Sequence, residues 1–150
     1  MVVANKSKAK GSRAEAALKK VLMDKTGLNW QRTPGSGALA EEHKLKGDLY
    51  IPQEKNTYTI EVKHYKDCHI NHTLISGKNP KILEWWEQAV RQAGQNGNIP
   101  LLIFKHDRSK WFVAGYGLHD GISRCIYLPN EDVDIILLDD WLSAKPIFIK

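Results

Sequence analysis

The chain has 150 residues, of which 42% are hydrophobic, and its 22 Lys and Arg outnumber its 17 Asp and Glu. A chain of this length can bury roughly two thirds of the surface that it exposes when unfolded, which suffices for one independently folding domain. Two cysteines are too few for a disulfide framework, no stretch approaches the ~20 apolar residues that span a bilayer, and the first residues lack the apolar segment of a secretory signal. These features argue against secreted disulfide-rich proteins and membrane proteins, so we expect a cytoplasmic protein without a membrane partner.

Basic charge is concentrated in the first part of the chain. Residues 1–110 carry 19 Lys and Arg against 11 Asp and Glu, whereas residues 111–150 carry 3 against 6. Because neutralisation of phosphates dominates nucleic-acid affinity, this asymmetry favours a polyanion-binding surface on the N-terminal part. We expect residues 1–10 to form a flexible basic arm and residues 11–150 to form a single domain. The candidate DNA-binding cations are Lys6, Lys8, Lys10, Arg13 and Arg32.

The first half of the chain predicts a helix followed by a hairpin. Apolar residues recur at helical spacing from Ala14 to Leu22, which predicts an amphipathic helix that ends near Gly27. Residues 28–32 suit a short strand. Two β runs, 48–51 and 58–65, are joined by turn-forming residues and predict an antiparallel pair.

The second half adds another helix and further strands. A helix begins near Pro80 and is closed by Gly94 and Gly97. Trp85 and Trp86 could stack on bases, but their place on its apolar stripe favours core packing or a subunit contact. The continuous apolar run 99–104 predicts a strand covered on both faces, and a further strand follows at 111–114. Residues 133–138 fit either a strand or a short helix. This order predicts an α/β fold with a central mixed β-sheet flanked by helices.

The second run of the hairpin carries a carboxylate and an ammonium on one face. The strand period of two places Glu61 and Lys63 side by side, with Ile60 and Val62 on the opposite, core-facing side. Pairing of the two runs would bring Asp48 toward Glu61. Two neighbouring carboxylates repel each other unless a cation lies between them, and Mg²⁺ is bound by one or two carboxylates together with substrate phosphates. The pattern outlines a phosphodiester-cleavage site, with a solvated Glu-Lys ion pair as the alternative.

Glu15 is a third candidate acid. It lies at the edge of the apolar stripe of the first helix, which is unusual for a solvated carboxylate. The same residue completes a capping box, in which Ser12 caps the helix and Glu15 reaches back to the amide of Ser12. The local sequence therefore leaves a structural and a catalytic interpretation open.

Two other segments also have a functional and a structural interpretation. Residues 32–37 combine Arg32, Ser36 and glycines that would let backbone amides approach a phosphate, although a plain turn has the same composition. A histidine and cysteine cluster could suggest zinc, but its spacing matches no recognised site and there is no second pair of ligands. The cluster consists of His64, Cys68, His69 and His72.

Four segments resemble, in order and spacing, archaeal-type Holliday junction resolvases, which are nucleases of the PD-(D/E)xK superfamily and also occur in bacteriophages. They are Gly11-Ser12-Arg13-Ala14-Glu15, Arg32 with Gly35-Ser36-Gly37, Gly47-Asp48-Leu49, and Ile60-Glu61-Val62-Lys63. The resemblance covers about residues 11–114. The acidic and polar residues 41–44 and the tail after Ala114 depart from the family pattern.

The resemblance implies a restriction-endonuclease-like core and a set of residue roles. Glu15, Asp48 and Glu61 would bind Mg²⁺, for which Mn²⁺ would substitute, and Lys63 would be the catalytic lysine. Arg32 and Ser36 would act at the scissile strand, so Ser36 joins the catalytic candidates. The implied activity is paired nicking of branched DNA at four-way junctions by a homodimer, in recombination and repair.

Two other functions compete with this one. A nuclease of the same superfamily that cuts duplex, flapped or damaged DNA would share the metal chemistry and differ in substrate preference. A non-catalytic DNA-binding module would need no clustered acids facing a polyanion, so the combination of Asp48, Glu61 and Lys63 argues against it.

Overall fold

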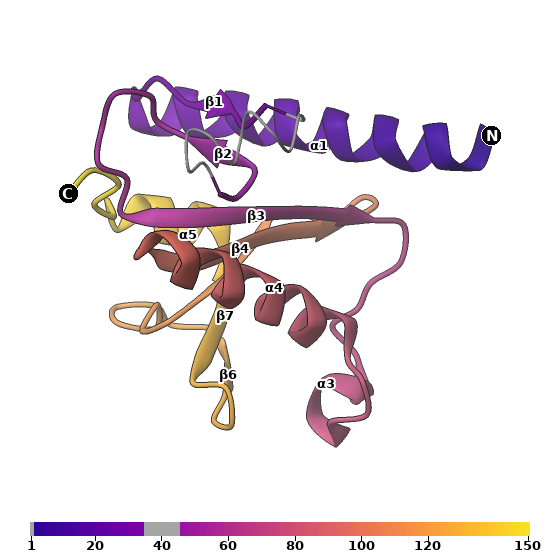
Figure 1. The fold of residues 1–150 in the computed structure, drawn as a ribbon. Helices are drawn as coiled ribbons and strands as arrows, with labels where there is room; N and C mark the ends of the chain where they lie inside the picture. Colours follow the sequence, from indigo (N-terminus) through magenta and orange to yellow (C-terminus); the bar gives the residue numbers. More distant parts are fainter. Residues whose placement is uncertain (1, 35–45) are drawn as a thin grey trace.

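Seven strands form one mixed sheet within residues 2–34 and 46–150, the part of the chain that the computed structural model describes, with side chains described from residue 10 onward. The strand order is β1-β2-β3-β4-β5-β7-β6 (Figure 1). Strands β3 and β4 run parallel, and all other neighbours are antiparallel. The strands are β1 (Gln31–Arg32), β2 (Leu49–Tyr50), β3 (Tyr58–Tyr65), β4 (Ile99–His106), β5 (Phe112–Gly115), β6 (Ile126–Leu128) and β7 (Val133–Leu137).

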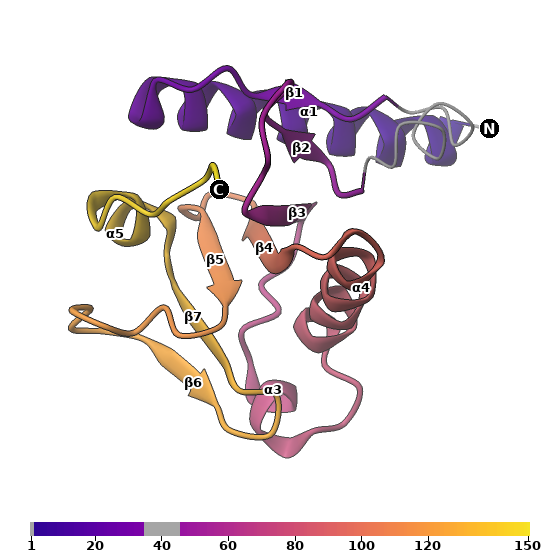
Figure 2. The ribbon, with the colours of Figure 1, turned by 60° about the vertical axis from the view of Figure 1, so that its left-hand side comes forward.

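Helices cover both faces of the sheet. They are α1 (Val2–Thr26), α3 (His72–Ser76), α4 (Lys81–Asn96) and α5 (Leu138–Ser143). Figure 2 shows α1 and α5 on one side of the sheet and α4 on the other. None of the helices in the described ranges is long and apolar enough to cross a membrane.

Each face of the sheet has its own apolar core. On the α1 face, Leu18 and Leu22 pack with Ile60 of β3 and Trp141 of α5. On the α4 face, Trp86 packs with residues of β4, β5 and β7 that point the opposite way. Strand β4 contributes alternately to both cores and is buried along its centre, as the continuous apolar run predicted.

The structure confirms the predicted fold class and most of the predicted elements. The mixed sheet flanked by helices is the expected α/β arrangement. The hairpin is antiparallel, with Leu49 opposite Ile60, and the ambiguous segment 133–138 is mainly strand β7. Helix α4 continues through Gly94 and ends at Asn96. Gly97 caps it with a left-handed backbone (φ +70°), and its amide donates to the Ala93 carbonyl.

Helix α1 begins at Val2, well before the start that the apolar periodicity predicted. Residues 2–10 lack an apolar stripe, which is why the periodicity placed the helix start later. Alanine and lysine are nevertheless good helix formers, so the helix extends through this segment. The capping box is wrong for the same reason. Ser12 lies inside α1, where its backbone amide is not an orphan donor that Glu15 must satisfy.

Candidate active site

Strands β1, β2 and β3 hold Asp48 in a fixed position. The Asp48 amide donates to the Ile60 carbonyl at 2.6 Å, and its carbonyl accepts from the Thr33 amide at 3.0 Å. Its side-chain Oδ2 accepts from the Val62 amide at 2.8 Å. The antiparallel pairing therefore continues past β2 through a side chain, and the Asp48 carboxylate lies against the middle of β3.

Gly47 makes this approach possible. Its φ of +82° is in the left-handed region, and a Cβ atom there would lie 2.7 Å from the Ile60 carbonyl oxygen and 2.9 Å from the Ile60 nitrogen. Only glycine permits both the conformation and the close backbone contact. The Gly47 amide donates to Oε1 of Gln92 at 3.0 Å. Helix α4 therefore also holds the segment that precedes β2.

Glu61 projects from β3 to the α4 side of the sheet and is only 3% exposed. Its neighbour Thr59 on the same face donates to Asn96 of α4 at 2.9 Å, which confirms the predicted alternation along the strand. Burial raises the pKa of Glu61 from its ordinary value of 4.5 to about 8, with a further contribution from the negative charge of Asp48 and opposition from Lys63. Without a cation, Glu61 is therefore largely protonated at neutral pH.

The pKa of Asp48 is also raised, and for the same main reason. Burial disfavours its charged form, while the hydrogen bond from the Val62 amide and the positive charges of Lys63 and Arg32 act in the opposite direction. Asp48 and Glu61 thus disfavour each other's ionisation. Lys63, half-buried on the same face of β3 as Glu61, favours the ionised form of both.

Glu15 approaches this site from α1. Nε of Arg32 donates to Glu15 Oε1 at 3.2 Å, and Nη2 of Arg32 donates to the Ser12 hydroxyl at 2.8 Å. Burial and the charge of Asp48 raise the pKa of Glu15, whereas Arg32 and Lys63 lower it. The charges of Glu15, Asp48, Glu61, Lys63 and Arg32 therefore influence one another's pKa values.

The donor set suits a hard divalent cation held by few protein ligands. In the described ranges, no three His, Cys, Asp or Glu side chains lie close enough together to form a metal centre by themselves. Two carboxylates that oppose each other's ionisation would, however, be relieved by one Mg²⁺ ion, which commonly takes one or two carboxylates and completes its shell with water and phosphate oxygens. Asp48 and Glu61 fit that requirement, and Glu15, paired with Arg32, acts on Glu61 through its charge.

The histidine and cysteine cluster has other partners. His64 contacts Asp107, Cys68 donates to the Ile70 carbonyl, and His69 packs edge-on against Tyr65 and Trp85. Trp85 and Trp86 are 6% and 3% exposed, so they are core residues.

Only some of the remaining predicted DNA-binding residues lie in the described part of the chain. Lys10 pairs with Asp107 at 2.9 Å, and Arg13 is exposed on α1. Lys6 and Lys8 belong to α1, but their side chains lie outside the described part. Ser36, with its flanking glycines, and the departing segment 41–44 also lie outside it.

Sequence reasoning missed the contributions of α4. Arg91 lowers the pKa of Glu61, and Gln92 holds the Gly47 amide. Both residues fall off the apolar stripe of a helix that is distant in sequence, and no local pattern distinguishes them from solvated residues. Only the packing of α4 on β3 brings them to the site.

Known proteins are similar in sequence to most of this chain. A family model described as "Phage putative PDDEXK endonuclease" matches residues 6–118. Protein D14 of Escherichia phage T5 is 41% identical in an alignment 146 residues long that covers 91% of this chain and 91% of that protein. Among solved structures, Archaeoglobus fulgidus Hjc, described as a Holliday junction resolvase, aligns with a TM-score of 0.45 and 18% identity over 88% of this chain and 87% of that one.

The mixed sheet, the paired acids at the β2–β3 hairpin and the lysine two residues beyond Glu61 define a nuclease of the PD-(D/E)xK class. The chain belongs to the phage PDDEXK endonuclease family.

Proposed function

We propose that the protein is a Mg²⁺-dependent, structure-selective DNA endonuclease that resolves four-way junctions by paired nicks. The observation that carries the metal-dependent part is the buried pair of Asp48 and Glu61, whose raised pKa values require a cation for both to be ionised at neutral pH. A site built to bind DNA alone would not place two buried acids where a polyanion must approach.

Different residues of the chain would have different roles in hydrolysis. Asp48 and Glu61 would hold the metal, and Glu15 would add a third carboxylate on the α1 side. When bound, Mg²⁺ supplies Lewis acidity and positive charge toward the scissile phosphate. Lys63 orients the attacking water or donates to a phosphate oxygen, where it offsets the negative charge that develops in the transition state. Mn²⁺, which also accepts oxygen ligands, should substitute for Mg²⁺.

Arg32 would contact the DNA in addition to pairing with Glu15. Its guanidinium already bridges Glu15 and Ser12, so it is oriented toward the acids while 40% of its side chain stays exposed. An exposed guanidinium beside the metal site suits a phosphate of the scissile strand. Ser36 would act at the same strand.

Selection of branched DNA rests on the order of the four sequence motifs and on symmetry. A four-way junction has approximate two-fold symmetry and needs two opposed cuts, whereas one chain supplies a single set of Asp48, Glu61 and Lys63. A two-fold dimer would place two sites at a fixed separation and would bind bent or branched DNA by shape.

The test is a comparison of substrates under matched conditions. A synthetic four-way junction, a flapped duplex and a linear duplex of the same sequence are incubated with the protein and either Mg²⁺, Mn²⁺ or EDTA. We expect symmetric nicks in the junction with either metal, slower cutting of the other DNAs, and no products in EDTA. Equal cutting of all three DNAs would instead favour a general nuclease. Products in EDTA would contradict metal dependence.

A further inference from the structure

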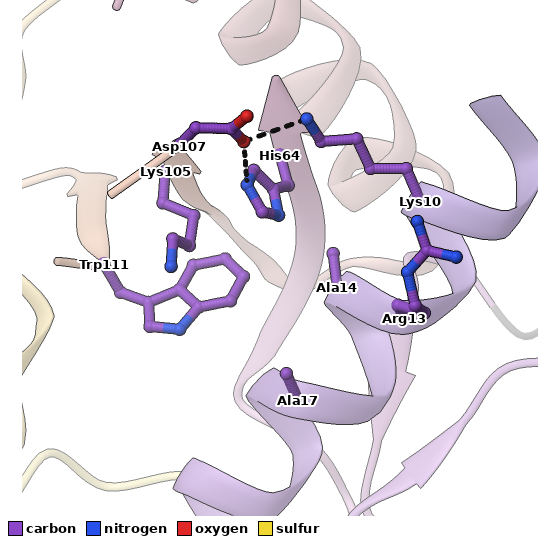
Figure 3. Close-up of a pocket in the computed structure, with 8 residues that line it drawn as sticks. All are labelled: Lys10, Arg13, Ala14, Ala17, His64, Lys105, Asp107 and Trp111. Atoms are coloured by element: carbon purple, nitrogen blue, oxygen red, sulfur yellow. Dashed lines mark hydrogen bonds and ion pairs between the residues drawn. The ribbon is translucent and has the colours of Figure 1, made fainter. Parts of the chain in front are cut away.

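A pocket of about 410 Å³ lies between α1 and the carboxyl ends of β3 and β4, on the face of the sheet opposite to Glu61 and Lys63 (Figure 3). Lys10 and Arg13 line it from α1, His64 from β3, and Lys105 from β4. Asp107 is the single acid among the described lining residues, against three Lys and Arg side chains. The pocket therefore carries a net positive charge that the catalytic site does not use.

Asp107 occupies this pocket in the manner of a bound anion. One of its oxygens, Oδ1, accepts from Lys10 Nζ at 2.9 Å and contacts His64 Nε2 at 2.9 Å (Figure 3). The carboxylate is 46% exposed, so solvent and ligands can reach it. A phosphate oxygen would make the same two contacts, and Lys105 and Arg13 would remain to face the other oxygens.

Lys10 and Lys105 both act on His64 while Asp107 is in place. Burial lowers the pKa of His64, and Lys10 and Lys105 lower it further, although the hydrogen bond with Asp107 acts in the opposite direction. Lys105 Nζ lies over the Trp111 ring, 5.5 Å from its centroid, which holds the ammonium at the pocket without neutralising it.

The pocket and the catalytic residues share one end of β3. His64 follows Lys63 directly and points to the other face of the strand, and Arg13 lies two residues before Glu15 on α1. In the described part of the chain, the pairing of β2 with β3 ends at Leu49 and Ile60, so no strand covers the outer edge of β3 beyond Asp48. DNA that crosses this edge can contact both faces.

We propose that this pocket binds a phosphate of the DNA backbone other than the scissile one, with Lys10, Arg13 and Lys105 as its cations and Asp107 as an internal competitor that the phosphate displaces. The inference rests on the proposed function in that DNA supplies the phosphate. In this proposal, Lys105 and Asp107 belong to the substrate-binding surface, although they lie more than 40 residues after Lys63 in the sequence.

Substitutions at Lys105 and Asp107 should change DNA affinity in opposite directions. The affinity is measured with Ca²⁺ in place of Mg²⁺, so that no cleavage occurs. Lys105→Gln should weaken binding and reduce the slope of log affinity against log salt by about 0.9, the contribution of one phosphate contact. Asp107→Asn keeps the side-chain shape, frees Lys10, and should tighten binding. Lys55→Gln removes an exposed lysine at the opposite end of β3 and should leave the slope unchanged.

A second readout separates this inference from the proposed function. Inorganic phosphate should shift the NMR signal of the His64 ring, identified by its loss in His64→Gln, and Lys105→Gln should abolish the shift. A wild-type protein that shows the shift but cuts no DNA would overturn the proposed function and leave the phosphate pocket intact. Weaker binding by Asp107→Asn, equal effects of Lys105→Gln and Lys55→Gln, or a His64 signal that phosphate does not shift would each overturn the pocket.

Discussion

Asp48 combines a catalytic and a structural role, and the two can be separated by choice of substitution. Its Oδ2 is the hydrogen-bond acceptor for the Val62 amide, which belongs to the buried part of β3. Asp48→Asn can keep that acceptor through its amide oxygen, whereas Asp48→Ala leaves the amide unpaired at a cost of about 1–3 kcal/mol. Both variants should lose metal-dependent cleavage.

Thermal or denaturant unfolding checks this prediction. Asp48→Asn should unfold close to the wild type, and Asp48→Ala should be clearly less stable. If both variants retain wild-type cleavage, Asp48 is not a metal ligand. If Asp48→Ala is fully stable, the contact with Val62 does not hold the hairpin.

The raised pKa of Glu61 predicts that the free energy of unfolding depends on pH. Its folded-state pKa, about 8, lies above its ordinary value of 4.5. The stabilisation from this group is therefore fully present below about pH 4.5 and is lost as the pH rises toward 8, at about 1.4 kcal/mol for each pKa unit. Glu61→Gln removes this loss and should raise the free energy of unfolding near pH 8 in the absence of metal.

Denaturant unfolding of the wild type and Glu61→Gln from pH 5 to 8 measures this effect. The difference in stability between the two proteins should grow with pH in favour of the variant. Mg²⁺ should then stabilise the wild type more than the variant, because a cation offsets the repulsion between Asp48 and Glu61. A pH-independent difference would show that Glu61 is not perturbed by its burial.

At the scale of elements, the β2–β3 hairpin depends on one glycine. Gly47→Ala would force a Cβ atom against the Ile60 backbone in a left-handed conformation, so the hairpin must shift. We expect loss of cleavage and a destabilisation of about 1–3 kcal/mol. Gly11→Ala is the matched control, since nothing lies within 4 Å of its added Cβ and the site is inside α1.

The control should change in the opposite direction. Alanine is preferred to glycine within a helix by about 0.5–1 kcal/mol, so Gly11→Ala should be slightly more stable than the wild type and remain active. Melting temperatures and cleavage rates of the two variants measure the contrast. An active, fully stable Gly47→Ala variant would mean that the close approach of Gly47 to Ile60 is dispensable.

The sequence predicted those parts of the site that depend on strand periodicity. Alternation along β3 placed Glu61 and Lys63 on one face, and turn residues between two β runs predicted the antiparallel contact that brings in Asp48. The Arg32–Glu15 ion pair joins residues that are not neighbours in any local pattern, so their geometry could not be derived from spacing. The same holds for Asp107, which reaches His64 only because β3 and β4 are parallel.

Periodicity was least informative at the N-terminus. Residues 2–10 show no apolar stripe, and a pattern based on burial cannot detect a helical segment without one. Segment 133–138 was ambiguous for a related reason, since a continuous apolar run fits both a buried strand and a helix. Pairing with β5 on one side and β6 on the other makes most of it a strand.

At the scale of the whole molecule, the hydrophobic centre of the proposed dimer interface must come from side chains other than Trp85 and Trp86. Trp85 and Trp86 lie in the core, and in the tail Ile135, Ile136 and Trp141 are each at most 5% exposed. These side chains stabilise the subunit itself and are not free to form the hydrophobic centre of a second interface.

Sedimentation at micromolar concentration tests the oligomeric state directly. We expect a dimer, and we expect the two nicks in a junction to be made within the lifetime of one complex. A species that sediments only as a monomer and cuts junction and linear duplex equally would contradict the paired-site account.

The central claim, that Asp48 and Glu61 bind the catalytic metal beside Lys63, is tested most directly by Mg²⁺ titration of junction cleavage with the wild type and Glu61→Gln in parallel. The wild type should cut with a rate that rises and saturates with Mg²⁺. The variant should bind the junction in Ca²⁺, unfold no more readily than the wild type, and produce no nicks at any Mg²⁺ concentration. Cleavage by Glu61→Gln at a rate near that of the wild type would contradict the account.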